Sequence, residues 1–139
     1  MAQYRKGANA ERELIHKLYD MGFSVVRIAG SGGTSLPSCD ILALSPEKKL
    51  AIECKAWANE NLSIKDAQMQ ELEEWSKKAG IEFLIAWKVP HKGWYFLPKE
   101  LFKKTGKAYS LSLKKAMKYG MDITIATGKQ KTLLTKTTK

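Results

Sequence analysis

The chain has 139 residues, 44% of them hydrophobic, and carries 24 Lys and Arg against 14 Asp and Glu, a formal net charge of +10. This length predicts one domain that buries about two-thirds of the surface of its unfolded form. No apolar run approaches the ~20 residues of a membrane span, and the N-terminal residues lack the apolar core of a signal peptide. We therefore expect no membrane partner and a cytoplasmic protein. The positive charge favours nucleic acid as a partner, with solubility or an acidic membrane surface as alternatives.

The first part of the chain predicts a helix, a strand and a loop of small residues. Apolar positions recur at helical spacing over residues 8–19, with Leu14 and Leu18 on one face. The β-branched residues over 23–29 predict a strand. The Gly- and Ser-rich segment 30–38 then leads directly into the next apolar run.

Two apolar runs in the following segment predict a β-hairpin. They span residues 40–44 and 50–56 and are separated by a polar turn that contains Pro46. An antiparallel hairpin folds the start of the first run back onto the end of the second. Charged side chains at these two ends therefore meet at one end of a small sheet.

Asp40, Glu53 and Lys55 are the charged residues that this hairpin brings together. Glu53 and Lys55 are two apart on a strand, so both side chains leave the same face. Two carboxylates offer the hard oxygen ligands that Mg²⁺ prefers, and a bound ion activates water and neutralises charge on a phosphodiester. Lys55 would contact the transition-state oxygens or orient the attacking water. The pattern predicts metal-dependent phosphodiester cleavage, although a solvated Glu-x-Lys pair on an outer strand face is the alternative.

The second half of the chain begins with a longer predicted helix, over residues 64–79. Ser63 is its expected cap, with Asp66 in the capping box, and Gly80 is its expected stop. Two further strands, joined by a turn, are expected to follow, the first over residues 81–89 and the second ending at residue 97.

The remaining residues predict short helices and a tail. One or two helical turns are expected over 98–104 and a basic helix over 110–119. Together these elements predict an α/β fold, a central mixed β-sheet flanked by helices, as a single domain over residues 1–126. We expect residues 127–139 to be a mobile basic tail that adds weak DNA contact or none.

Several segments of the chain match one protein family in order and with compatible spacing. They are Arg5-Lys6-Gly7-Ala8-Asn9-Ala10-Glu11-Arg12-Glu13-Leu14, Gly22-Phe23-Ser24-Val25-Val26-Arg27, Gly30-Ser31-Gly32, Asp40-Ile41 and Ile52-Glu53-Cys54-Lys55. This combination resembles the archaeal Holliday-junction resolvases, and the match runs from about residue 5 to residue 97. The resemblance implies a restriction-endonuclease-like nuclease fold.

The resemblance also implies roles at the active site. Glu11, Asp40 and Glu53 would be the metal ligands, Lys55 would stabilise the transition state, and the cofactor would be Mg²⁺, with Mn²⁺ as a substitute. An acid in the first turn of a helix is favoured by the helix dipole whatever its function, which is the alternative for Glu11.

Further residues would engage DNA if the resemblance holds. Ser31 in the loop would reach the active site when DNA binds, although Ser35 and Ser38 are other serines of the same loop. Solvated surface charges are the alternative for the basic positions. The positions that match DNA-contacting ones in the family are Arg5, Lys6, Arg12 and Arg27.

Met69, Leu72 and Trp75 recur on the predicted helix 64–79 at a spacing of three. The family buries the corresponding helix in a homodimer interface, whereas packing on the chain's own sheet is the alternative. A two-fold dimer would suit a four-way junction, because the junction needs two matched cuts in opposing strands.

We therefore expect a homodimeric, Mg²⁺-dependent endodeoxyribonuclease that resolves four-way DNA junctions during recombination and repair. It would be nucleoid-associated, and recombination or replication proteins would be its protein partners. A nuclease of the same core that cuts duplexes or flaps, and a non-catalytic basic DNA-binding module, are the alternatives. The clustered acids argue against a pure binder, because they repel phosphate.

Overall fold

The structure, a computed structural model, describes residues 2–28 and 36–129, and their side chains from residue 7 onward. Ser31 and most of the proposed tail lie outside the described residues. In the part of the chain that is described, no helix combines the length and the apolar character needed to cross a membrane.

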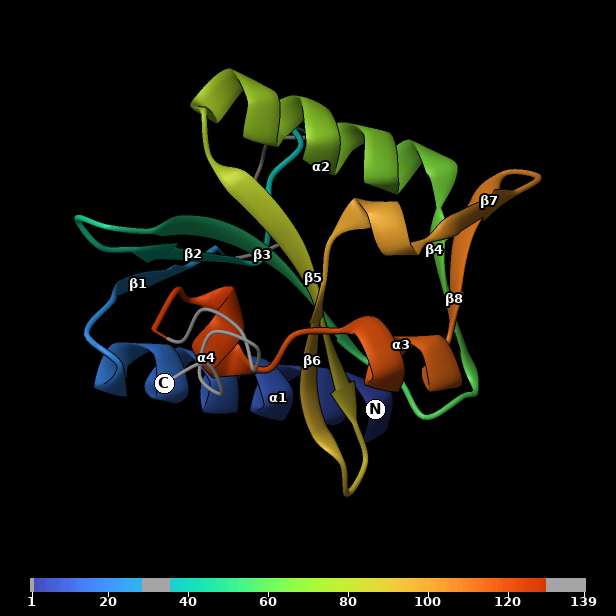
Figure 1. Ribbon diagram of the computed structural model, residues 1–139, viewed down its shortest axis with the longest axis horizontal. Coiled ribbons are helices and arrows are strands. Elements are labelled where there is room, and N and C mark those ends of the chain that lie inside the picture. The colour runs from blue at the N-terminus through green and yellow to red at the C-terminus, as the bar shows by residue number, and fades with distance from the viewer. Residues whose placement is uncertain (1, 29–35, 130–139) are drawn as a thin grey trace, which may run out of the picture.

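A five-stranded mixed sheet forms the centre of the molecule, in the order β1-β2-β3-β5-β6 (Figure 1). The parallel pair is β3 with β5, and the other neighbours are antiparallel. The predicted hairpin is the β2–β3 pair, so the mixed sheet expected from the sequence is confirmed. The strands are β1 (Ser24–Arg27), β2 (Ile41–Leu44), β3 (Lys49–Ala56), β5 (Glu82–Val89) and β6 (Gly93–Leu97).

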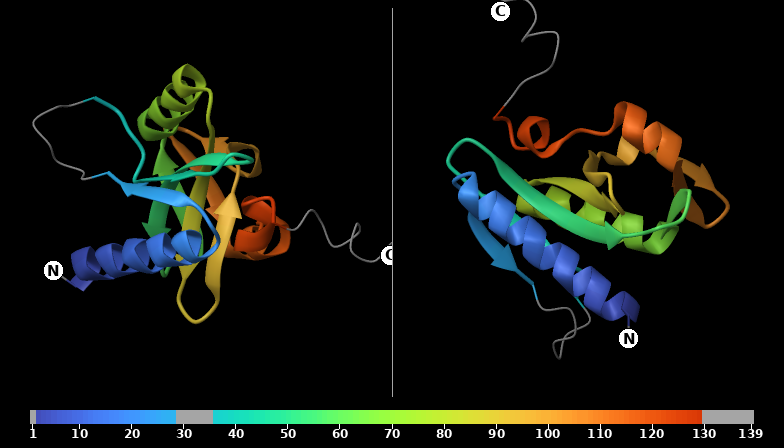
Figure 2. Two further views of the ribbon diagram at one scale, coloured as in Figure 1. Left: turned by 90° about the vertical axis from the view of Figure 1, so that its left-hand side faces the viewer. Right: turned by 90° about the horizontal axis from the view of Figure 1, so that it is seen from below.

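Helices cover both faces of this sheet. The long helix α1 (Ala2–Asp20) lies against one face, together with α4 (Ile123–Ala126). The helix α2 (Asp66–Ala79) lies against the other face, together with α3 (Leu113–Tyr119). Figure 2 shows α1 and α2 on opposite sides of the strands from two further directions.

Alternation along the strands divides the core into two clusters, as expected for a sheet buried on both faces. Leu50 and Ile52 of β3 pack toward α1, where Leu14 and Leu18 are fully buried. Ala51 of β3 packs toward α2. Odd and even positions of β3 therefore face different helices, which decides where its charged residues point.

A second, three-stranded sheet packs on the α2 side and was not predicted from the sequence. Its strands lie in the order β4-β8-β7, with β4 spanning Asn61–Lys65, β8 spanning Ala108–Ser112 and β7 spanning Lys103–Thr105. Leu62 and Ile64 of β4 are buried while their neighbours are exposed. Alternation of this kind is typical of a strand with one face on a core.

Three predictions from the sequence are corrected by this sheet. Ser63 lies within β4 and does not cap α2, which begins at Asp66 with no side-chain cap. The stretch after Pro98 forms only a short 3₁₀ turn, η1 (Lys99–Leu101), before β7. The basic helix begins later than expected, after Ser112, whose hydroxyl caps it by accepting from the backbone N–H of Lys115.

The end of α2 agrees with the prediction. Gly80 adopts a left-handed backbone with φ of 69° and its N–H donates to carbonyls of the last helical turn. A side chain would be strained at this φ, so glycine is the natural stop.

The contact face of α2 corrects the assignment of Met69 and Leu72 to a dimer interface. Their exposed fractions are 0% and 3% within the single chain, because both pack into the cluster under α2. The alternative stated for this helix, packing on the chain's own sheet, therefore holds for these two side chains. Trp75 packs at the margin of the same cluster and remains partly exposed.

Candidate active site

The register of the β2–β3 hairpin places Asp40 next to Glu53. Ile41 pairs with Ile52 across the hairpin, so the residue before the first lies beside the residue after the second. The N–H of Asp40 donates to the carbonyl of Ile52 at 3.1 Å, and its own carbonyl accepts from the N–H of Ile28 at 2.8 Å. Backbone hydrogen bonds on both sides therefore fix Asp40 between β1 and β3.

Glu53 and Lys55 leave the same face of β3, as predicted, and this face is the one turned toward α2. Cys54 between them packs toward α1 and is a free thiol. The Nζ of Lys55 lies 3.8 Å from Oε2 of Glu53. Asp40, Glu53 and Lys55 therefore meet at one place, on the side of β3 that faces α2.

Two hydrogen-bond donors to these carboxylates were not predicted from the sequence. The backbone N–H of Cys54 donates to Oδ2 of Asp40 at 2.8 Å, and Nε2 of Gln68 in α2 donates to Oε2 of Glu53 at 2.8 Å. A backbone donor leaves no mark in the sequence. Gln68, however, lies one turn before Leu72 on the same helix face, and a polar residue on an apolar stripe is a signal that could have found it.

Burial makes both carboxyls of this pair hard to ionise. Burial first, and then the charge of Asp40, raise the pKa of Glu53 to about 8, although the charge of Lys55 lowers it. Burial also raises the pKa of Asp40, which the N–H of Cys54 partly offsets. Strongly perturbed carboxyls beside a lysine are typical of functional sites.

Comparison with known proteins agrees with this geometry. The family model described as archaeal Holliday junction resolvase (Hjc) matches residues 2–133. The chain belongs to the archaeal Holliday-junction resolvase family. This confirms the resemblance found in the sequence.

Relatives of this resolvase family match almost end to end. A protein of Archaeoglobus fulgidus named crossover junction endodeoxyribonuclease Hjc is 32% identical over 124 residues, 89% of this chain and 90% of the relative. One of the same name from Sulfolobus acidocaldarius is 30% identical over 124 residues, 88% of this chain and 86% of the relative.

Solved structures confirm the expected fold class. The structure of Archaeoglobus fulgidus Hjc, described as a Holliday junction resolvase, superimposes with a TM-score of 0.80 at 28% identity, covering 88% of this chain and 96% of that one. The bacterial homing endonuclease I-Ssp6803I superimposes with a TM-score of 0.53 at 18% identity, covering 99% of both chains. At that identity the second likeness concerns the fold alone.

In this member of the resolvase family Glu11 does not join the two carboxyls directly. Its Oε1 accepts from Nε of Arg27 at 3.0 Å, although its charge still raises the pKa of both Asp40 and Glu53. Within residues 2–28 and 36–129 no three carboxylate, imidazole or thiol groups are arranged to hold a metal ion between them. The structure thus brings together two of the three predicted ligands.

The paired carboxyls nevertheless suit a hard divalent cation. Asp40 and Glu53 present oxygen donors side by side, and the charge of Asp40 opposes ionisation of Glu53. Mg²⁺ commonly uses one or two carboxylates and completes its shell with water and substrate phosphate. The donor set therefore fits such an ion.

Three of the basic residues predicted to bind DNA lie on α1, and Arg27 is the last residue of β1. Arg12 is exposed and its Nη1 donates to Oδ1 of Asn9 at 2.8 Å. Arg27 is half exposed but engaged by Glu11. Arg5 and Lys6 lie in the first turns of α1, with side chains outside the described residues.

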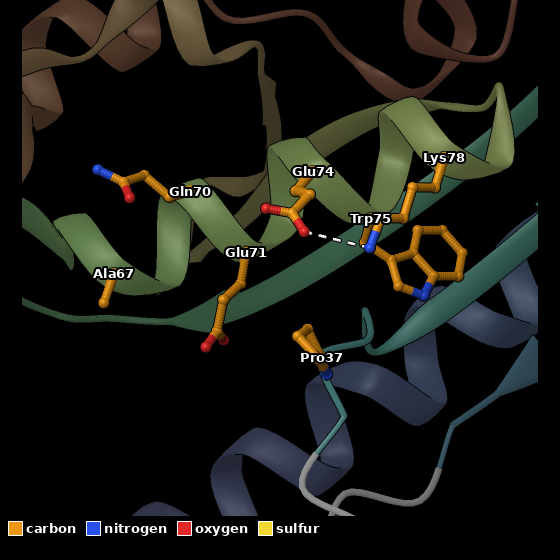
Figure 3. A pocket seen from close by; sticks show the side chains of 7 residues that line it. All are labelled: Pro37, Ala67, Gln70, Glu71, Glu74, Trp75 and Lys78. Atoms are coloured by element: carbon orange, nitrogen blue, oxygen red, sulfur yellow. Dashed lines mark ion pairs between the residues drawn. The ribbon is translucent and has the colours of Figure 1, made fainter.

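A hollow of about 310 Å³ lies elsewhere, between α2 and the segment around Pro37 (Figure 3). Glu71 and Glu74 line it, and Glu74 pairs with Lys78 at 3.2 Å. Acidic walls repel phosphate. Asp40, Glu53 and Lys55 are not among the residues that line this hollow, so it is separate from the candidate active site.

Proposed function

We propose that this protein is a crossover junction endodeoxyribonuclease, which cuts paired phosphodiester bonds near the crossover of a four-way DNA junction. It would act in homologous recombination and repair. The observation that carries the proposal is the buried Asp40–Glu53 pair with Lys55 beside it, in a chain of the resolvase family.

Asp40 and Glu53 would hold the divalent cation, Mg²⁺ first and Mn²⁺ as a substitute. When bound, the cation lowers the pKa of a water molecule and neutralises charge that develops on the phosphorus. Lys55 lies within 3.8 Å of Glu53, so its ammonium is placed to stabilise the same developing charge. Glu11 would add a third ligand if Arg27 released it, for example to a DNA phosphate.

Recognition of the junction would rest on shape and phosphate contacts. The net charge of +10 supports this. We assign the contacts to the α1 end of the site, near the exposed Arg12, with Ser31 reaching in from the loop. The remaining basic residues of the set are Arg5, Lys6 and Arg27.

The protein would act as a homodimer, since two matched cuts need two equal sites at a fixed separation. The interface would not use Met69 and Leu72, which the chain already buries, whereas Trp75 retains exposed surface. Residues 1–126 would form the nuclease domain, and Thr127, which is only 3% exposed, packs with it. The dimer would be nucleoid-associated and recruited by recombination or replication proteins.

The decisive experiment uses an end-labelled synthetic four-way junction and a sequence-matched linear duplex, each with Mg²⁺ and with EDTA. Symmetric Mg²⁺-dependent nicks in the junction alone are the expected result. Equal cutting of both substrates would instead support a duplex nuclease of the same core. Tight junction binding without cutting would favour a DNA-binding module.

A further inference from the structure

We propose that Gln68 is a positioning residue, which holds the Glu53 carboxylate and the Lys55 ammonium in the orientations that the cleavage reaction uses. The inference rests on the proposed function and deepens it. It assigns a role in α2, an element that the sequence did not connect with the active site.

The contacts of Gln68 bridge the two charged groups. Its Nε2 donates to Oε2 of Glu53 at 2.8 Å, and its Oε1 accepts from Nζ of Lys55 at 3.4 Å. A carboxylate only accepts hydrogen bonds and an ammonium only donates them. The neighbours therefore dictate both the orientation of the amide and which of its atoms faces each charge.

The backbone that carries Gln68 is firmly anchored. Gln68 lies in the first turn of α2, next to the fully buried Met69 and one turn before Leu72. Its side chain is half-buried against β3, on the side of the sheet where Glu53 and Lys55 emerge. Because the helix is already anchored, only the side chain of Gln68 has to be ordered for its amide to hold the two neighbours in place.

The first consequence concerns Glu53. An ionised carboxylate offers about four acceptor sites on its two oxygens. One donor on Oε2 selects a single rotamer and leaves acceptor sites free for a cation shared with Asp40. Hydrogen bonds of this kind commonly orient metal-binding carboxylates, and their loss typically reduces metal affinity or activity by about 10- to 100-fold.

The second consequence concerns Lys55. Its ammonium lies 3.8 Å from Glu53 and 3.4 Å from the Gln68 carbonyl oxygen. Without the amide, the Lys55 ammonium would be free to form a close ion pair with Glu53. In that pair the Glu53 carboxylate would not be available to a metal ion, and the ammonium would not be available to the phosphodiester. The amide therefore keeps the two groups beside each other but available to the reaction. The Lys55 contact is the longer of the two, so we expect the Glu53 contact to dominate.

The test replaces Gln68 by Met, which keeps the length of the side chain and removes both hydrogen bonds. The control is Gln70→Met, on the same helix, where the side chain is exposed and donates to Asp66. Three quantities are measured for each variant: single-turnover cleavage of the junction, junction affinity in EDTA, and the affinity of the DNA-free protein for Mn²⁺. The Mn²⁺ affinity is obtained from the shift that Mn²⁺ causes in the unfolding temperature.

We expect Gln68→Met to slow cleavage about 10- to 100-fold and to weaken Mn²⁺ binding by a similar factor, with junction affinity unchanged. Gln70→Met should match the unaltered protein in all three. A merely structural role would lower stability without changing Mn²⁺ affinity. Should Gln68→Met not fold, Gln68→Ala with Gln70→Ala as control takes its place, because Ala is the best helix former.

Cleavage and Mn²⁺ affinity of Gln68→Met within twofold of the unaltered protein would overturn the inference, and so would equal losses in both Met variants. Failure of the proposed function has a different signature. In that case the unaltered protein does not cut the junction, while the Mn²⁺ titration still decides whether Gln68 positions Glu53.

Discussion

Two glutamates on opposite faces of the same sheet show what distinguishes a structural carboxylate from a reactive one. Glu13 of α1 accepts from Nζ of Lys88 at 2.6 Å and from Nε1 of Trp94 at 2.7 Å, and these bonds hold its pKa below the ordinary value. Glu53 is buried beside Asp40, and burial raises its pKa to about 8. Glu13 therefore has a close ammonium partner in Lys88, whereas the nearby ammonium of Lys55 does not offset the effect of burial on Glu53. That imbalance is the property that a metal and a phosphodiester can use.

The largest expected effect is a difference in junction cleavage between variants of the two glutamates. Glu53→Gln should reduce single-turnover junction cleavage more than about 100-fold, since loss of an outer partner alone typically reduces activity 10- to 100-fold. Junction affinity in EDTA should not fall, because Glu53 is buried and its charge, where present, repels phosphate. Glu13→Gln, the matched control, should cut within about tenfold of the unaltered protein. Equal losses in both variants would remove the distinction between the two glutamates.

The next effect is on stability in the absence of divalent metal. The pKa of Glu53 rises from an ordinary value of 4.5 to about 8 in the fold, so the folded chain binds more protons than the unfolded chain between these pH values. The free energy of unfolding in EDTA should therefore fall as pH rises from about 5 to 8, by up to roughly 1.4 kcal/mol per pH unit. Denaturant titrations at several pH values measure this.

Two controls make the pH dependence specific. Glu53→Gln should flatten the curve and be more stable than the unaltered protein at pH 8, because the amide carries no charge to bury. Mg²⁺ should restore stability near pH 8 and have less effect near pH 5, where Glu53 is protonated. A pH profile as steep in Glu53→Gln as in the unaltered protein would assign the effect elsewhere.

A smaller effect is expected at Glu13. Its side chain is 43% exposed, so solvent screens the ion pair with Lys88. Glu13→Gln should lower the free energy of unfolding at pH 7 by less than about 1 kcal/mol. Because the pKa of Glu13 is lowered, its contribution is present above pH 4.5 and is lost as the pH falls below it. Salt should shrink the difference from the unaltered protein, and a difference that salt leaves unchanged would exclude the ion pair as its cause.

The hairpin and its acids were readable from the sequence because their signals are local. Two apolar runs around one turn determine which residues face each other, so Asp40, Glu53 and Lys55 followed from spacing. Family motifs then gave these residues their roles. The same local logic placed the end of α2 at Gly80.

The second sheet was missed because its pairing is distant and its signals conflict. Asn61 to Lys65 alternates polar and apolar residues, which favours a strand, but Ser63 followed by Asp66 also matches a helix cap. The partner that settles the conflict, β8, lies more than forty residues further along the chain. Local sequence propensity carries no information about a pairing between such distant segments.

The contacts that complete the site were missed for the same reason. Gln68 meets Glu53 across 15 positions, and Arg27 meets Glu11 across 16. Both contacts depend on how a helix seats on the sheet. The spacing of residues within the hairpin predicted which of its charged side chains would lie together. The contacts made by residues on the helices depend on tertiary packing, which the spacing does not determine.

The smallest expected effect concerns a third glutamate, Glu74, in the hollow beside α2 (Figure 3). Its side chain is 70% exposed and it pairs with Lys78 one turn away at 3.2 Å. Exposed pairs at this spacing contribute about 0.3–0.5 kcal/mol, so Glu74→Gln should change the free energy of unfolding by no more than that. Cleavage should be unchanged, since the hollow shares no residue with the Asp40–Glu53 site. The size of the effect of Glu→Gln substitution would then decrease from Glu53 through Glu13 to Glu74, in the order of decreasing burial. A loss of cleavage at unchanged stability in Glu74→Gln would instead mean that the outer side of α2 contacts a partner that the reaction requires, and burial would no longer be sufficient to rank the three.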